Sequence, residues 1–251
     1  MPPMHSATLK SPTVPAHTPP QPPGAKAQRS DGAGAKRRLL LSALKLFAEK
    51  GFAKTSTREI ALATGANIAA ISYYFGDKAG LYRAVFTEPL GSPKDDIARY
   101  VQPHFTLRQS LDGFYSSFLA PMKQGELVQQ CMRLHFREML EPTGLWAQEL
   151  EQGIKPAHEA LAGVLCRHLG LPRPDVEVQR LAFAIAALAL QKFMCRDVVD
   201  AISPQLVKSA RAIDQTATRL ADFAEAMVAA EMRRRSGARA SPGTPAKRKK
   251  I

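Results

Sequence analysis

Residues 55–82 contain two short amphipathic segments around a tight turn, and this stretch constrains the fold more than any other part of the chain. Ser56 precedes Glu59 by three residues, the spacing of a capping box, in which each side chain accepts a free backbone N–H at a helix start. Gly65 belongs to the residue type that enters the left-handed conformation closing a helix, and Asn67 can cap the helix that follows. The pattern predicts two helices joined by a turn at residues 65–67.

The second helix of this pair has one side suited to burial and one suited to contact. Ile71 and Phe75 recur at the i, i+4 spacing of a buried face. Ala69 and Ala70 are small enough to let another surface approach closely. Asp77 can cap a third helix that follows, with Lys78 in its first turn. In such a helix-turn-helix the second helix enters the DNA major groove and its neighbours hold phosphates. The alternative is an αα unit that only packs.

The same stretch resembles the DNA-binding region of TetR (tetracycline-repressor-like) family regulators. The matching positions are residues 56–61, Gly65, the aromatic run 73–75, Lys78 and Leu81. Ser72 departs from the family, since many members carry an aromatic there, and Gly80 stands where many carry an acidic residue. The resemblance implies an all-α protein, with an N-terminal three-helix DNA-binding domain joined to a larger helical bundle for ligand binding and dimerisation.

The geometry of the motif and the matching family positions predict contacts to DNA from both sides of the turn. Contacts to phosphates are expected from Thr57, Tyr74 and Lys78. Contacts to bases or to the groove wall are expected from Arg58, Asn67, Ala69, Ala70 and Ser72.

The residues before this motif divide into a leader and a helix. Residues 1–34 are rich in proline and lack apolar periodicity, so we expect a disordered leader, which is not a secretory signal. Basic residues near its end are candidates for DNA phosphates, and a solvated leader is the alternative. Leu40, Leu44 and Phe47 lie at helical spacing, which predicts a first helix over 35–50 that ends at Gly51. The predicted DNA-binding domain therefore covers residues 35–88.

Prolines and glycine between residues 89 and 93 suit a joint before a helical body over 95–235. No strand alternation is seen there, and Gly153 with Pro156 suggests one interruption. The predicted helical segments are 103–122, 126–140, 143–169, 174–195 and 204–234. Residues 236–251 form a basic tail that we expect to be disordered, and that either adds nonspecific DNA affinity or is simply a solvated charge run.

An uninterrupted run of ten apolar residues occupies 181–190. It is too short to span a bilayer, and a helix that is apolar all round is buried. With the final helix, whose apolar stripe includes Ile213, Leu220 and Phe223, it predicts a four-helix homodimer interface across a two-fold axis. The alternative is that both helices belong to the monomer core.

Charge and cysteine content limit the function. A formal net charge of +13, from 35 Lys and Arg against 22 Asp and Glu, favours an anionic partner such as nucleic acid, although many of the charges lie in the tails. Three widely spaced cysteines without a C-x-x-C pair indicate neither a zinc site nor disulfides, and predict a cytoplasmic, nucleoid-associated protein. His135 and Glu138 alone make a weak metal pattern. We therefore expect no enzyme, no cofactor and no membrane partner.

A pocket for a small molecule is expected in the body, since apolar and polar residues alternate there. This region is similar to the CecR-like (CerR-type) subgroup at residues 67–75, at 137–138 and 142–143, and at the P-x-H of 156–158. The resemblance implies an effector-responsive body without identifying the effector. The pocket candidates are Phe114, Phe118, His135, Arg137, Glu138, Trp146 and His158. The alternatives are an internal Arg137–Glu138 ion pair and core roles for both histidines.

Together these patterns predict a DNA-binding transcriptional regulator. We expect a homodimer with two recognition helices about one helical turn apart on palindromic double-stranded operator DNA. A small-molecule effector of unknown identity would weaken operator binding, which makes repression the default. The alternatives are a transcriptional activator and a general chromosome-coating protein without an effector.

Overall fold

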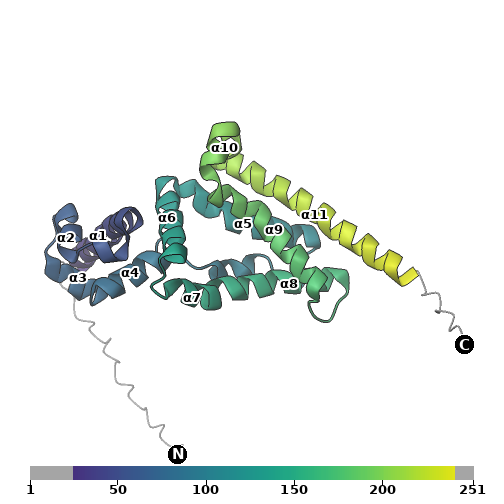
Figure 1. Ribbon diagram of the computed structural model, residues 1–251, viewed down its shortest axis with the longest axis horizontal. Coiled ribbons are helices and arrows are strands. Elements are labelled where there is room, and N and C mark those ends of the chain that lie inside the picture. Colours follow the sequence, from purple (N-terminus) through teal and green to yellow (C-terminus); the bar gives the residue numbers. More distant parts are fainter. Residues whose placement is uncertain (1–24, 241–251) are drawn as a thin grey trace, which may run out of the picture.

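The computed structural model describes residues 25–240, with side chains from 32 to 237. Of the leader (1–34) and tail (236–251) that were expected to be disordered, residues 25–34 and 236–240 are helical, and the rest lie outside the described residues. The described residues form helices, turns and bends and contain no strand, which confirms the all-α prediction. The molecule is elongated, with a four-helix head (residues 32–88) at one end and the long last helix running toward the other (Figure 1).

The head contains the predicted helix-turn-helix. Its helices are α1 (Ala25–Lys54), α2 (Thr57–Thr64), α3 (Ile68–Phe75) and α4 (Lys78–Thr87). Helix α1 begins at Ala25, before the expected start at residue 35 and directly after the Pro22-Pro23-Gly24 sequence. Gly51, with φ of 81°, interrupts α1 at the predicted position, and one further turn follows it.

One apolar core holds the head together. Leu40, Leu44 and Phe47 of α1 are buried in it, as their helical spacing predicts, together with Ile60 of α2 and Ile71 of α3. The rings of Phe47 and Tyr82 meet edge to face, with centroids 4.9 Å apart. Aromatic pairs of this kind contribute about 0.5–1.5 kcal/mol beyond the area they bury.

Helix α6 (Glu126–Leu140) connects the head to the rest of the chain (Figure 1). Its Cys131 and Leu134 are buried in the head core beside α1 and α4, although they follow the predicted joint by some forty residues. Burial raises the pKa of the Cys131 thiol to about 12, so this cysteine stays protonated at neutral pH. The head core is therefore completed by a helix from the second half of the molecule.

The body (residues 93–237) matches the predicted segments with some additions. Its other elements are η1 (Pro93–Arg99), α5 (Leu107–Leu119), η2 (Ala120–Gln124), α7 (Leu145–Glu149), η3 (Leu150–Ile154), α8 (Lys155–Leu169), α9 (Val176–Met194), α10 (Arg196–Ile202), η4 (Pro204–Leu206) and α11 (Ala210–Ala240). The predicted interruption near Gly153 is present as the π-helical turn η3. The separate helix α10 was not predicted, and it begins where Cys195 leaves helical geometry.

The body core lies where α5 packs against α8, α9 and α11. Tyr115 is fully buried at its centre and donates its hydroxyl hydrogen to the carbonyl of Ile185 at 2.9 Å. Leu181 and Ile185 of the apolar run face this core, whereas Phe183 and Leu190 of the same run are exposed. The run is thus buried on one side only. No helix among residues 25–240 combines the length and the hydropathy that crossing a membrane requires.

Candidate nucleic-acid interface and cavity

Side-chain caps start all three short helices of the head. The Ser56 Oγ accepts from the Glu59 N–H at 3.1 Å, and the Asn67 Oδ1 accepts from the Ala69 N–H at 2.9 Å. At the start of α4 the Asp77 Oδ1 accepts from the Gly80 N–H at 2.6 Å. These predicted caps are confirmed, and each is worth about 1 kcal/mol.

The turn between α2 and α3 also has its predicted geometry. Gly65 adopts φ of 65°, and its N–H closes α2 on the carbonyls of Ala61 and Leu62. Gly80 explains one departure from the family, because a Cβ there would lie 2.0 Å from the carbonyl oxygen of Phe75. The predicted capping box is only half formed, because the Glu59 carboxylate pairs with Lys50 and not with the Ser56 N–H. The bond to Lys50 lowers the pKa of Glu59 below its usual value.

The residues predicted to contact DNA differ in their exposure to solvent. Arg58, Asn67, Ala69 and Ser72 are exposed on α2, the turn and α3. Thr57 is half-buried. Ala70 and Tyr74 pack partly against the head core. The ammonium group of Lys78 lies over the ring of Phe52, 4.5 Å from its centroid. The eight residues thus lie on α2, the turn, α3 and the first turn of α4, and four of them are exposed while the other four are partly buried.

Tyr73 is a candidate that the sequence prediction omitted. It is 82 % exposed on α3, next to Ser72, with its ring 4.9 Å from that of Tyr74. A tyrosine in such a position offers a hydroxyl to phosphates and a ring to sugars and bases. The sequence could have predicted this exposure, because Tyr73 does not share the i, i+4 spacing of the buried residues Ile71 and Phe75.

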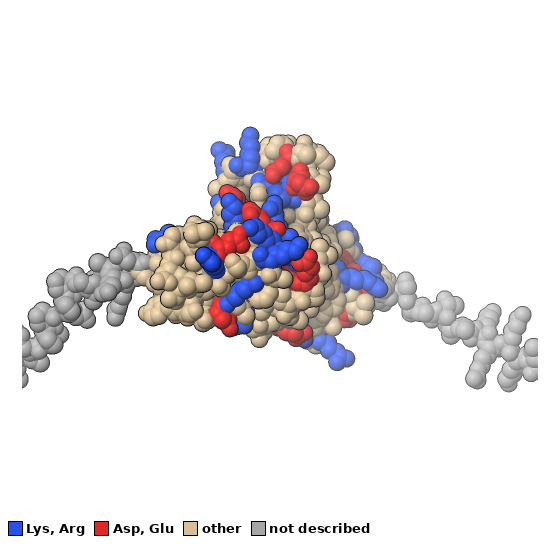
Figure 2. All heavy atoms as spheres, turned by 60° about the vertical axis from the view of Figure 1, so that its left-hand side comes forward, with Lys and Arg blue, Asp and Glu red and all other residues tan. Residues whose placement is uncertain are grey.

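The charges do not form one continuous basic patch on the face in Figure 2, where blue and red atoms intermingle beside a broad uncharged area. Part of the net positive charge lies outside the described residues, at Lys10 and in the final run 247–250. On this face (Figure 2) the described residues therefore offer separate charged groups and no uniform basic surface.

A fully buried carboxylate, Glu138 of α6, links the head to the body. Its Oε2 accepts from the hydroxyl of Tyr82 in α4 at 2.9 Å, and its Oε1 accepts from the backbone N–H and the hydroxyl of Thr143, both at 2.8 Å. The Leu145 N–H donates to Oε1 at 3.1 Å. Burial, followed by the bond to Glu138, raises the pKa of Tyr82 far above its usual value.

The other predicted pocket residues lie in separate places. Arg137 pairs with Glu141 at 3.4 Å and donates to the carbonyl of Glu49, so the alternative of an Arg137–Glu138 ion pair is not realised. His135 stacks on Phe86 of α4 with centroids 4.2 Å apart, and burial lowers its pKa.

The remaining candidates belong mainly to the body. Trp146 stands edge-on to the His135 ring at 6.3 Å. Phe114 and Phe118 pack in the body core, and His158 bonds to Gln179 at 2.7 Å. The structure therefore does not bring the seven residues around one cavity, because their helices direct them to different cores.

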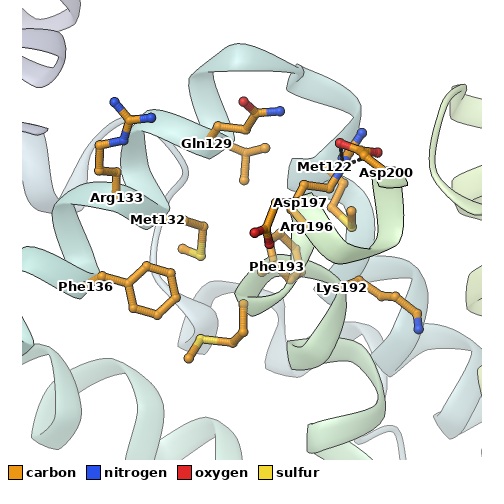
Figure 3. Close-up of a pocket in the computed structure, with 12 residues that line it drawn as sticks. Met122, Gln129, Met132, Arg133, Phe136, Lys192, Phe193, Arg196, Asp197 and Asp200 are labelled. Carbon is orange, nitrogen blue, oxygen red and sulfur yellow. Dashed lines mark hydrogen bonds and ion pairs between the residues drawn. The ribbon is translucent and has the colours of Figure 1, made fainter. Parts of the chain in front are cut away.

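A cavity of about 380 Å³ instead lies between α6 and the α9–α10 corner (Figure 3). It is lined by Met122, Val128, Gln129, Met132, Arg133, Phe136, Lys192, Phe193, Met194, Arg196, Asp197 and Asp200. None of the seven pocket candidates is among these residues. Sequence reasoning missed the cavity because its walls come from helices some sixty residues apart. No group of three potential metal ligands occurs in the described part of the chain.

Two family models match the chain, one over each part. The model of bacterial regulatory proteins of the tetR family matches residues 39–85, within the head. The model of the C-terminal domain of the HTH-type transcriptional dual regulator CecR matches residues 107–230, within the body.

Two curated proteins are similar in sequence. The HTH-type transcriptional dual regulator CecR of Shigella flexneri is 31% identical over 158 residues, which cover 59% of this chain and 70% of that protein. The probable HTH-type transcriptional regulator YttP of Bacillus subtilis (strain 168) is 47% identical over 53 residues, covering 21% of this chain and 26% of that protein.

Solved structures share the fold at lower identity. The TetR family regulator PfmR of Thermus thermophilus superposes with a TM-score of 0.56 at 18% identity, covering 74% of this chain and 96% of that one. SmeT, in its complex with triclosan, gives a TM-score of 0.55 at 17% identity, covering 77% of this chain and 90% of that one. From the helix-turn-helix head, the CecR-type body and these likenesses we conclude that the chain belongs to the TetR family of DNA-binding transcriptional regulators, in the group that shares the CecR C-terminal domain.

Proposed function

We propose that the protein is an effector-responsive repressor that binds a palindromic operator as a homodimer, in the cytoplasm and on the DNA of the nucleoid. Family membership supports the DNA-binding part, and the exposed residues of α2 and α3 support the mode of contact. The proposed contacts are Thr57, Arg58, Asn67, Ala69, Ala70, Ser72, Tyr74 and Lys78, with Tyr73 added from its exposure.

The homodimer is supported by apolar side chains left exposed on two adjacent helices of the body. Val176, Phe183 and Leu190 recur every seven residues along α9 and are 65 %, 65 % and 43 % exposed. Phe223 and Met232 are exposed on α11, which packs beside α9. Exposed apolar surface of this kind marks protein–protein interfaces, and a second copy of the chain would cover it across a two-fold axis.

The single observation that carries the effector response is the double role of α6. One side of this helix buries Cys131 and Leu134 in the head core and bonds to α4 through Glu138. Its other side places Met132 and Phe136 in the wall of the cavity. A ligand that shifts α6 would therefore shift the head. A typical coupling of about 1–3 kcal/mol changes operator affinity roughly 5- to 150-fold, and operator DNA must weaken ligand binding by the same factor.

The test is fluorescence anisotropy of the full chain on DNA from its own upstream region, beside a scrambled duplex, across a range of salt concentrations. A preference of about 10³ or more is expected for the operator. Lys78→Ala should weaken binding to both duplexes and make the salt slope shallower by about one unit.

The matched control is Lys155→Ala on α8, whose ammonium group pairs with Glu151 in the body. This variant should leave the slope as it is. Equal affinity for both duplexes would contradict the proposal and favour a chromosome-coating protein. The description of the CecR relative as a dual regulator supports activation at some promoters as a second candidate function.

A further inference from the structure

The cavity between α6 and the α9–α10 corner has the size and the composition of a small-molecule site. Its volume of about 380 Å³ falls within the range of about 300–1,000 Å³ in which ligand pockets lie. Two aromatic rings, Phe136 and Phe193, and three thioethers, Met122, Met132 and Met194, line it. Thioethers adapt to irregular ligands, and aromatic faces attract cations as well as apolar groups.

One charged group, the exposed Asp197, is turned toward this apolar space (Figure 3). Figure 3 shows its carboxylate directed toward the middle of the cavity, between Met132 and Phe193. Among the residues whose side chains the structure describes, no lysine or arginine forms an ion pair with Asp197. The other carboxylate in the wall, Asp200, forms an ion pair with Arg196. The Arg196 Nε donates to the Oδ1 and Oδ2 of Asp200 at 3.0 and 2.9 Å.

The basic residues of the wall are directed elsewhere. The ammonium group of Lys192 points away from the cavity and donates to Gln191 Oε1 at 2.7 Å. The guanidinium of Arg133 also points away, and Arg133 lines a second, smaller cavity together with Glu49 and Glu126. The main cavity is therefore open to solvent and mostly apolar, and its one charge without an ion-pair partner among the described residues is negative.

We propose that this cavity binds an organic cation with an aromatic or branched apolar body, and that the carboxylate of Asp197 pairs with the positive charge of the ligand. The inference rests on the proposed function, because it names the chemical class of the effector. The apolar body packs on Met132, Phe136 and Phe193, and the cationic end meets the carboxylate. Since Met132 and Phe136 belong to α6, the same contacts act on the helix that holds the head.

Three naphthalene probes of nearly equal size separate charge from shape. They are naphthylmethylammonium, the neutral naphthalenemethanol and the anionic naphthylacetate, and their binding to the full chain is measured by isothermal titration calorimetry. The cation should bind roughly two- to fivefold tighter than the alcohol, the gain of an exposed ion pair, and the anion should bind most weakly. Equal affinities, or an anion that binds most tightly, would overturn the proposal.

Substitutions locate the charge effect. Asp197→Asn should lower the affinity for the cation to that for the alcohol and leave the alcohol unchanged. Asp96→Asn, an equal change of charge on η1 outside the cavity, should keep the order of the three probes. Met132→Ala should lower the affinity for each of the three probes by a similar factor. A cation whose affinity is unaltered by Asp197→Asn would refute the assignment.

The link to DNA has its own readout. Naphthylmethylammonium should lower operator affinity of the parent chain in the anisotropy assay, and Asp197→Asn should shift this response to roughly two- to fivefold higher probe concentrations. If the protein binds its operator specifically but Asp197→Asn does not change cation binding, the proposed ligand class is wrong and the proposed function still holds. Asp197-dependent cation binding without sequence-specific DNA binding supports the ligand class and removes the proposed function. Cation binding that leaves operator affinity unchanged overturns this cavity as the effector site.

Discussion

At the scale of single residues, the bond between Tyr82 and Glu138 joins α4 to α6 inside the protein. Tyr82→Phe would leave the buried carboxylate with one donor fewer. We expect a loss of about 1–3 kcal/mol in the free energy of unfolding, measured by urea denaturation. Tyr73→Phe is the control, because its hydroxyl belongs to a residue that is 82 % exposed, and it should change stability by less than about 0.5 kcal/mol. Equal losses would show that the bond to Glu138 is not the cause.

His135 gives the same junction a dependence on pH. Burial lowers its pKa, so the folded state prefers the neutral ring. Below the ordinary histidine pKa of about 6.5 the unfolded chain takes up the proton more readily, and stability falls as the pH falls. His135→Phe keeps a ring against Phe86 and should reduce the loss of stability between pH 7 and 5. Urea midpoints of both proteins at the two pH values provide the check, and identical losses would contradict it.

Individual functional residues could be predicted only where local spacing defines them. The caps Ser56, Asn67 and Asp77 were identified because each acts within three residues of itself. Asp197 and Phe136 were not, because they line one cavity only after α6 packs against α9, which continues into α10. Glu138 was assigned to a pocket because the sequence does not show that Tyr82, 56 positions away, donates to it.

At the scale of elements, the contact between α5 and η1 depends on Gly113. A Cβ at this position would lie 2.3 Å from the carbonyl oxygen of Arg99, which is backbone and cannot rotate away. Gly113→Ala should therefore separate the two elements and destabilise the protein by about 1–3 kcal/mol. Chemical denaturation measures this loss.

Gly163 of α8 provides the matched control, since a Cβ there meets nothing within 4 Å. Gly163→Ala should be neutral or stabilise the protein by up to about 1 kcal/mol, because alanine is the better helix former. A loss at residue 163 as large as that at residue 113 would assign the effect to the helix itself and not to the contact with η1.

Most elements could be predicted because apolar periodicity and caps are local signals. Helix α6 has the predicted bounds, and the irregular turn at residues 150–154 lies beside the predicted interruption. The start of α1 was not predicted, because residues 25–34 lack the apolar periodicity from which the helix was placed. The break before α10 could not be predicted, because no proline and no side-chain cap marks it. The prolines and glycine at residues 89–93 predict a boundary between two domains. They do not indicate that α6, which follows this boundary, packs into the core of the head.

At the scale of the whole molecule, the exposed apolar residues of α9 and α11 determine the expected state of assembly. Phe183→Asp places a charge on this surface without opening the monomer core, because Phe183 is 65 % exposed. We expect sedimentation velocity to show a dimer for the parent chain and a monomer for this variant. Leu62→Asp, at a residue of the head that is 82 % exposed, should remain dimeric. A Phe183→Asp dimer would place the interface elsewhere.

The return of α6 to the head also limits how such a protein can exchange its parts. A recombination event that joins this head to a foreign body after residue 88 would bring α1 and α4 without Cys131, Leu134 and Glu138. The hybrid would carry an open apolar surface and an unpaired Tyr82 hydroxyl. A chimera that keeps its stability must inherit the facing side of α6 as well. The residues that stabilise the DNA-binding head are therefore encoded in two separate segments of the gene.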